Sequence, residues 1–124
     1  MLPELSDKER TWYILKGYNI TIDHWGNRVW YLNDVCHRED GPAVEHADGH
    51  QAWYKNGQRH RTDGPAYERS DGHQAWYLNG KRHREDGPAV EYADGDRAWW
   101  LNDVSMTEEE HQKTVSEMMK NVTI

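Results

Sequence analysis

The sequence predicts a mainly β protein: an elongated antiparallel sheet of tandem β-hairpin repeats, closed at its C-terminal end by an α-helix. Two observations carry this prediction. A pattern of Trp-Tyr, a His, Asp-Gly-Pro-Ala and Asp-Gly recurs every 23 residues, beginning at Trp30, Trp53 and Trp76. Periods of this size are typical of arrays of small supersecondary units. The repeats are followed by residues 105–124, whose apolar spacing predicts an amphipathic capping helix.

Each unit contains an Asp-Gly pair between two short runs of alternating polarity, which predicts a hairpin with a two-residue turn. The turns are expected at Asp48-Gly49, Asp71-Gly72 and Asp94-Gly95. In the last unit the expected strands are residues 89–93 and 97–101. Pro88 stands at the start of the first strand, where its missing N–H does no harm. We expect Gly87, just before it, to adopt a backbone conformation that other residues resist.

A two-residue turn fixes which residues lie opposite each other. Val90 would face Trp99, and the earlier units would pair Tyr67 with Trp76 and Val44 with Trp53, so that these residues form an apolar stripe. The other face would then combine aromatic rings with a regular row of carboxylates: Tyr54, Tyr77, Trp100, Glu45, Glu68 and Glu91. A turn longer by one residue would exchange these assignments.

The composition is consistent with one domain without a conventional aliphatic core. The chain has 124 residues, with seven Trp, seven Tyr and no Phe. We expect aromatic stacking between neighbouring units to stabilise the array. The domain would comprise an N-terminal segment (1–10), the hairpin array (11–104) and the C-terminal helix (105–124). A net charge of −7 argues against nucleic acid or an anionic membrane as the main partner.

Cysteine usage and hydropathy bear on the cellular compartment. Cys36 is the one cysteine, so no disulfide can form within a monomer, which favours a reducing compartment. The sequence shows no signal peptide and no apolar run near 18 residues. We therefore expect a cytoplasmic protein, located in the host cytoplasm if a phage encodes it.

The two ends of the chain depart from the repeat. Residues 12–17 are interpreted as the second strand of a degenerate unit, followed by an alternating run at 18–23 and by Trp25-Gly26 in place of Asp-Gly. A helix over residues 7–16 is the alternative, because Ser6 and Glu9 have capping-box spacing. Beyond residue 101 the chain is expected to leave the repeat. Capping-box spacing recurs at Ser105–Glu108 and Thr107–Glu110, and one helix face would carry His111, Val115, Met118 and Val122.

The units resemble MORN-type repeats. The connection Asn79-Gly80-Lys81-Arg82-His83, its counterpart at residues 56–60 and the Asp-Gly pairs match that family over roughly residues 12–101. The second strand departs from the family pattern, with Ala75-Trp76-Tyr77 replacing Tyr-x-Gly-x-Trp, which is similar to a divergent bacterial and phage variant. The resemblance implies a twisted antiparallel sheet that serves as a protein-binding or lipid-contacting platform, and it implies no catalysis.

Histidine and aspartate recur in register, which raises metal and enzyme hypotheses. Equivalent residues such as His37, His60 and His83 are separated by two strands, or about 10 Å. One zinc ion needs all its ligands near 2 Å, so we expect no metal and no cofactor. A His–Asp pair in every unit is typical of a structural role, and we expect no catalytic residues. A small hydrolase that uses one His–Asp loop remains an alternative.

The function that the sequence favours is a non-enzymatic protein-binding module. Its partner would contact the aromatic and acidic face, through Tyr54, Tyr77, Trp100, Glu45, Glu68 and Glu91. The alternative is a phage or bacterial inhibitor or antitoxin-type protein that blocks a nucleic-acid-processing host protein through a DNA-mimic-like acidic surface. Both hypotheses predict a partner with a basic surface; neither predicts direct contact with nucleic acid or membrane lipid.

Overall fold

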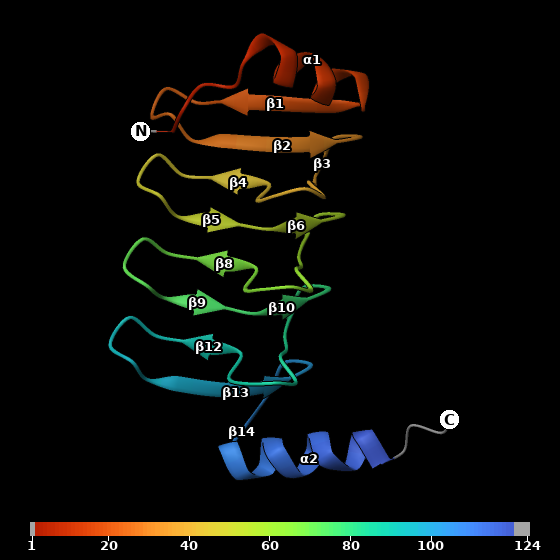
Figure 1. Ribbon diagram of the computed structural model, residues 1–124, viewed down its shortest axis with the longest axis vertical. Helices are drawn as coiled ribbons and strands as arrows, with labels where there is room; N and C mark the ends of the chain where they lie inside the picture. Colours follow the sequence, from red (N-terminus) through yellow and green to blue (C-terminus); the bar gives the residue numbers. More distant parts are fainter. Residues whose placement is uncertain (1, 121–124) are drawn as a thin grey trace.

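The computed structural model describes residues 2–120 as an elongated column of antiparallel strands with a helix at each end (Figure 1). The predicted antiparallel sheet of hairpins is confirmed, as is a helix that packs against the sheet at the C-terminal end. In chain order the elements are α1 (Asp7–Leu15), β1 (Tyr18–Ile22), β2 (Arg28–Leu32), β3 (Val35–Cys36), β4 (Val44–Glu45), β5 (Gln51–Ala52), β6 (Tyr54–Lys55), β7 (Gln58–Arg59), β8 (Tyr67–Glu68), β9 (Gln74–Ala75), β10 (Tyr77–Leu78), β11 (Lys81–Arg82), β12 (Val90–Glu91), β13 (Arg97–Leu101), β14 (Val104–Met106) and α2 (Glu108–Lys120).

One sheet runs the length of the column in the order β1-β2-β4-β5-β8-β9-β12-β13-β14, with β3 paired to β2. Two small hairpins, β6–β7 and β10–β11, continue from it along one side (Figure 1). Equivalent strands β4, β8 and β12 begin at residues 44, 67 and 90, which confirms the 23-residue period. Residues 40–100, all of which the structure describes, contain no helix. We call residues 30–52, 53–75 and 76–98 the first, second and third units.

The hairpin turn is one residue longer than predicted. In the third unit the Tyr92 amide donates to the Asp96 carbonyl and the Gly95 amide to the Tyr92 carbonyl, so three residues form the loop and Gly95 has φ 95°. This is the three-residue hairpin loop with a left-handed glycine. Val90 therefore lies opposite Ala98, and the prediction that it faces Trp99 is wrong. The same correction applies to Tyr67 and Val44, which lie opposite Ala75 and Ala52 instead of Trp76 and Trp53.

The N-terminal residues form a helix, and the strand interpretation of residues 12–17 is wrong. The Ser6 hydroxyl accepts a hydrogen bond from the Glu9 amide, and the Glu9 carboxylate accepts one from the Ser6 amide. This capping box satisfies two amides that would otherwise lack partners at the start of α1. Tyr13 is the buried residue of α1, and its ring meets the Trp30 ring edge-on at 6.0 Å. The predicted strand at 18–23 and the turn at Trp25-Gly26 are confirmed.

The repeat continues past residue 101, contrary to the prediction. Asn102 and Asp103 both have positive φ and form a tight turn, after which β14 pairs with β13. Ser105 lies within β14, so α2 begins three residues later than the predicted boundary. The Thr107–Glu110 capping box forms, with a hydrogen bond in each direction. Val122, which the sequence placed on the apolar helix face, lies outside the described residues.

Neighbouring units are joined through their histidines. The Nδ1 atom of His60 accepts a hydrogen bond from the Asn79 amide at 3.0 Å, and the Gly80 amide donates to the Arg59 carbonyl. His37 and His83 accept from the amides of Asn56 and Asn102 in the same way. An acceptor at Nδ1 places the ring proton on Nε2. The recurrent histidine is therefore a structural link between one unit and the turn of the next.

Alanine fills the positions that the stacked units bury most completely. Ala43, Ala66 and Ala89 have no exposed surface, and their carbonyls accept hydrogen bonds from the amides of Trp30, Trp53 and Trp76. A small side chain at these positions lets one strand lie close to the next unit. Neither helix in residues 2–120 combines the length and the apolar character that crossing a membrane requires.

Candidate functional site on the Trp–Arg face

The sheet has two chemically different faces. Tyr67 and Glu68 are consecutive residues of β8, so their side chains point to opposite faces. The Arg59 guanidinium lies 4.8 Å from the Tyr67 ring and 5.4 Å from the Tyr77 ring. On the other side, Arg61 binds Glu68 and lies 3.9 Å from the Trp53 ring. We call the face with Trp30, Trp53, Trp76, Arg38, Arg61 and Arg84 the Trp–Arg face, and the face with Tyr54, Tyr77 and Trp100 the Tyr face.

The six residues proposed from sequence as one binding surface are divided between these faces. Glu45, Glu68 and Glu91 lie on the Trp–Arg face, where each accepts a hydrogen bond from an arginine. The rings of Tyr54, Tyr77 and Trp100 lie on the Tyr face, where Arg59 and Arg82 contact them. The additional residue in the turn causes this division, because a shift of one residue in the pairing moves the side chains of a strand to the opposite face.

An arginine at the centre of each unit organises the Trp–Arg face. The Arg61 guanidinium stacks on Trp53, its Nε donates to Asp63 Oδ1 at 3.0 Å, and its NH1 group donates to the Pro65 carbonyl at 3.1 Å and to Glu68 at 3.4 Å. Arg61 is 23% exposed. A planar guanidinium can make these contacts at once because its donors form a fixed fork and its face can lie on a ring.

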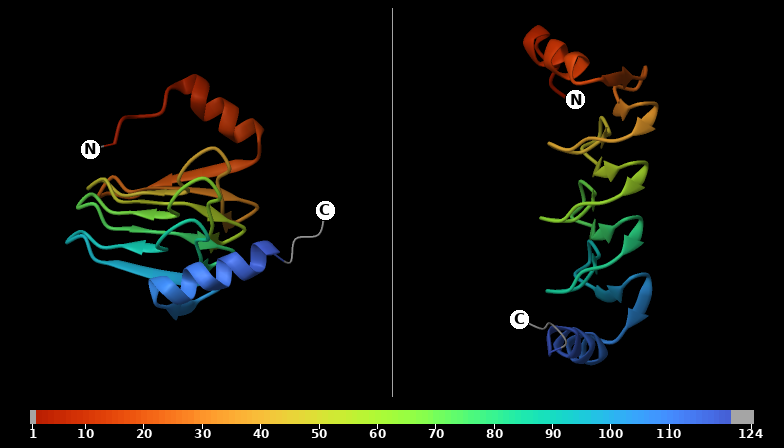
Figure 2. Two further views of the ribbon diagram at one scale, coloured as in Figure 1. Left: turned by 60° about the horizontal axis from the view of Figure 1, so that its bottom comes forward. Right: turned by 90° about the vertical axis from the view of Figure 1, so that its right-hand side faces the viewer.

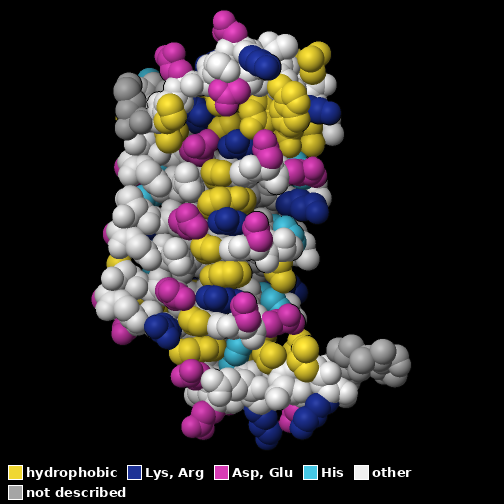
Figure 3. Space-filling view, viewed as in Figure 1, with side chains coloured by type: hydrophobic (Ala, Val, Ile, Leu, Met, Phe, Trp, Pro, Cys, Tyr) yellow, Lys and Arg dark blue, Asp and Glu magenta, His cyan; other side chains and the backbone are white. Residues whose placement is uncertain are grey.

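The same arrangement recurs in the flanking units. Arg38 and Arg84 lie 4.0 Å from the rings of Trp30 and Trp76. Their Nε atoms donate to Asp40 and Asp86, each at 2.9 Å. Figure 3 shows the result as a column of hydrophobic and basic side chains along the middle of the molecule, with carboxylates on both sides. We call the row of Arg38, Arg61 and Arg84 the arginine ladder. Its signal is present in the sequence, where an arginine follows the tryptophan of each unit by eight residues.

Glycine in the Asp-Gly-Pro segment makes room for the guanidinium. A Cβ atom on Gly64 would lie 2.7 Å from Cζ of Arg61, and one on Gly87 would lie 2.8 Å from Cζ of Arg84. Neither glycine is among the described residues with positive φ. The expectation that Gly87 adopts a conformation that other residues resist is therefore wrong. The close approach of a bound arginine explains the glycine instead.

The two helices complete the ladder at its ends. From α1, the Tyr13 hydroxyl donates to Asp40 Oδ2 and accepts from the Arg38 NH2 group, both at 2.9 Å. From α2, His111 is 2% exposed, and its Nε2 lies 2.6 Å from the Arg84 carbonyl oxygen. Figure 2 shows both helices on the same side of the strands. The Trp–Arg face is therefore bounded by a helix at each end.

The carboxylates on this face differ in exposure. Asp63 and Asp86 are 83% and 80% exposed, whereas Glu68 is 32% exposed. The hydrogen bond from Arg61 lowers the pKa of Asp63 below its ordinary value, and the bond from Arg84 lowers the pKa of Asp86. The loop aspartates are thus held ionised and open to solvent. Glu39 and Glu85, which precede an aspartate in their loops, are also largely exposed.

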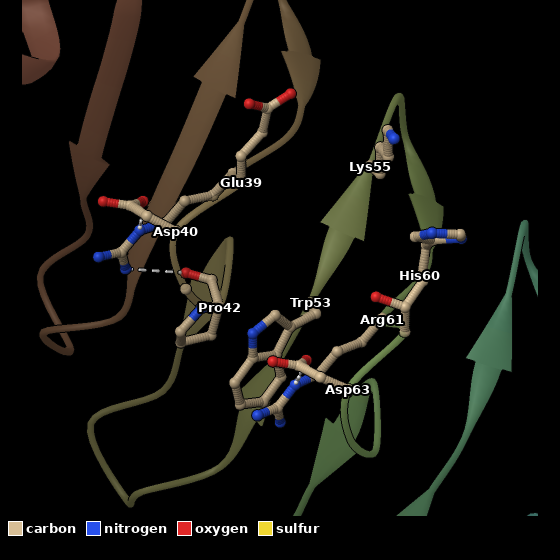
Figure 4. Close-up of a pocket in the computed structure, with 11 residues that line it drawn as sticks. Glu39, Asp40, Pro42, Trp53, Lys55, His60, Arg61 and Asp63 are labelled. Carbon is tan, nitrogen blue, oxygen red and sulfur yellow. Dashed lines mark hydrogen bonds and ion pairs between the residues drawn. The ribbon is translucent and has the colours of Figure 1, made fainter.

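Hollows lie between successive units on this face. One of them encloses about 830 Å³ between the loop of the first unit and Trp53, Arg61 and Asp63 of the second (Figure 4). Its equivalent one unit further encloses about 400 Å³. A third, of about 430 Å³, lies between the third unit and α2 and includes Trp99 and His111 in its walls. Open hollows with charged rims can receive side chains of another molecule.

The recurrent histidine and aspartate of the second unit do not pair with each other. His60 Nδ1 accepts from a backbone amide, and Asp63 binds Arg61, so the two side chains are committed to different partners. Within residues 2–120, no three His, Cys, Asp or Glu side chains gather closely enough to hold a metal ion.

Comparisons with protein families, curated proteins and solved structures found no match to this chain.

Proposed function

We propose that this chain is a non-enzymatic protein-binding module of MORN-like architecture, and that the Trp–Arg face holds a partner with a basic surface. The observation that supports this proposal is the row of exposed carboxylates along the loops of successive units. The row comprises Glu39, Asp40, Asp63, Glu85 and Asp86. Adjacent units are two strands apart, so the carboxylates recur about every 10 Å.

The Trp–Arg face has the properties that binding a basic partner requires. Exposed carboxylates steer a basic surface and fix its orientation, and the half-buried Trp53 and Trp76 beside them supply apolar contact area. The inner glutamates are less available, because Arg38, Arg61 and Arg84 bind them. Aromatic rings contact arginines on both faces, so the exposed loop carboxylates, and not the rings, favour the Trp–Arg face. The proposal therefore replaces the six residues expected from sequence, which lie on two faces, by the loop carboxylates of the Trp–Arg face.

Charge reversal on the loops tests the proposal. The double substitution Glu39→Lys and Glu85→Lys reverses two exposed carboxylates that, within residues 2–120, form no ion pair with an arginine. Glu117→Lys in α2 is the matched control, because residue 117 is exposed and is not in the wall of the hollow beside that helix. The partner is captured from a host lysate with the wild-type chain, identified by mass spectrometry and then titrated against each purified variant.

We expect the double variant to bind at least about tenfold more weakly and Glu117→Lys to bind like the wild type, since each lost ion pair at an interface changes affinity markedly. Wild-type affinity should also fall as salt is added, because exposed charges are screened. Unchanged affinity in a correctly folded double variant would place the binding surface elsewhere.

Acidic mimicry of nucleic acid is a second candidate, and the regular spacing of the carboxylates favours it. In that case the captured partner would be a nucleic-acid-processing protein, and double-stranded DNA would compete with this chain for it. A partner that binds DNA and this chain simultaneously would contradict mimicry but not protein binding.

A further inference from the structure

The second unit differs from its neighbours at two positions that lie in one hollow. Lys55 stands where the other units have Leu32 and Leu78, and Thr62 stands where they have Glu39 and Glu85. Lys55, His60 and Thr62 all line the hollow of about 830 Å³ between the first and second units (Figure 4). Compared with the other units, Lys55 adds a positive charge and Thr62 removes a negative charge. Both differences therefore make the hollow less negative.

These two differences leave donors without acceptors. In the other units the histidine Nε2 has a carboxylate beside it, with Glu39 at 3.4 Å from His37 and Glu85 at 3.7 Å from His83. Thr62 provides no such carboxylate to His60. Because His60 Nδ1 accepts from the Asn79 amide, the ring proton is on Nε2, which can donate. Within residues 2–120, the side chains of Lys55 and Thr62 form no hydrogen bond or ion pair.

The acidic groups of the hollow are for the most part already bound. Asp40 accepts from Arg38 and Asp63 accepts from Arg61. Glu39 faces the hollow from the first unit, and its Oε1 lies beside His37. Burial lowers the pKa of His60, and the nearby charge of Lys55 lowers it further. An ammonium, a neutral ring N–H and a hydroxyl thus share one wall of the hollow.

We propose that Lys55, His60 and Thr62 form a subsite for a single carboxylate group carried by a partner. An ammonium contributes one positive charge, which matches a singly charged carboxylate better than a doubly charged phosphate near Glu39. Charge-assisted hydrogen bonds are the stronger kind, and a carboxylate can accept several of them. The subsite uses other residues and the opposite ligand charge from the loop carboxylates, so it goes beyond the proposed function.

The subsite would give the repeat array a register. Units that are alike offer a ligand several equivalent positions, displaced by one unit from each other. One unit that prefers an acidic group breaks this equivalence, because a displaced ligand would place its carboxylate beside Glu85 and Leu78 instead. A basic segment with one acidic residue would then bind in one position only.

A titration with sodium acetate tests the subsite without any partner. Histidine ring and threonine signals are followed by NMR at pH 7.5, with sodium chloride keeping the ionic strength constant. We expect a saturable shift at His60 and Thr62, while His83, whose surroundings keep Glu85 and Leu78, serves as the internal reference. Lys55→Leu and Thr62→Glu restore the residues of the other units, so they should fold. Each should weaken acetate binding about tenfold, as loss of a hydrogen bond to a charged group does.

Three results would overturn the subsite. An equal shift at His83 would show a general effect of acetate, and unchanged binding in Lys55→Leu would exclude the ammonium as a ligand. Tighter binding of inorganic phosphate than of acetate under the same conditions would contradict the assignment to a carboxylate. The Asn79 amide signal reports whether the link from His60 to the third unit stays intact in each variant.

Discussion

Replacing Arg61 by lysine tests whether the arginine ladder stabilises the fold. Lysine keeps the charge but has neither the planar fork nor the flat face of a guanidinium. It cannot stack on Trp53 and at the same time donate to Asp63 and to the Pro65 carbonyl, as Arg61 does. The substitution therefore separates the geometry of the side chain from its charge.

The magnitude follows from the contacts. Stacking of a largely buried cation on a tryptophan contributes about 0.5 to 2 kcal/mol. A hydrogen bond from a charged donor to a half-buried carbonyl contributes about 1.5 to 3 kcal/mol. The ion pair with the exposed Asp63 adds little, because solvent screens it. These contributions overlap, and lysine recovers part of them, so we expect Arg61→Lys to lower the free energy of unfolding by about 1.5 to 2.5 kcal/mol.

Arg69→Lys is the matched control. Arg69 forms an ion pair with Asp71 at 2.9 Å, and both side chains are 44% exposed. An exposed pair of this kind contributes little, so this variant should stay within about 0.5 kcal/mol of the wild type. Urea unfolding followed by circular dichroism and by tryptophan fluorescence gives both values, and coincident curves establish a single transition. Equal stability of the two variants would show that the ladder is a solvated row with no structural role.

Two further predictions concern the same unit. Gly64→Ala should lower the free energy of unfolding by about 1 to 2 kcal/mol, because the new Cβ would displace the Arg61 guanidinium, which several contacts hold in place. In an Arg61→Ala background, urea unfolding should show a much smaller cost of the same substitution. An equal cost in that background would show that the strain does not come from Arg61. Burial, together with the charge of Lys55, lowers the pKa of His60 below 6.5. The unfolded ring therefore takes up a proton at higher pH than the folded ring, so stability should decline as pH falls below about 6.5. His60→Asn keeps an acceptor for the Asn79 amide and removes the titration; a pH series of thermal melts should show a weaker decline in this variant, and an identical decline would exclude His60 as its source.

The period and the hairpins were predictable because they depend on local signals. The turn length was not, because Asp-Gly is compatible with both a two-residue and a three-residue loop. The chain in fact uses both loops. Asn56 and Gly57 have positive φ and form a two-residue turn, whereas Gly49 follows an aspartate without positive φ in the longer loop. In the three-residue loop, the residue before the aspartate also belongs to the loop. The Asp-Gly dipeptide alone does not reveal whether that residue is in the loop or in the strand.

The N-terminal error has a different origin. Trp12-Tyr13 repeats the dipeptide that begins all three units, and this likeness favoured a strand. The capping box at Ser6 and Glu9 favoured a helix, and the local signal proved decisive. Trp12 is about half exposed and Tyr13 is buried, so the dipeptide does not take the place of a unit's Trp-Tyr.

The ends of the ladder show why the helices belong to the array. Arg38 has no earlier unit beside it, and the Tyr13 hydroxyl accepts from its NH2 group while donating to Asp40. The Arg84 carbonyl has no fourth loop beside it, and His111 occupies that place. Residues outside the repeat thus add polar contacts at the first and the last arginine of the row. Terminal units of a repeat array need such caps, and α1 and α2 provide them at the two ends of this sheet.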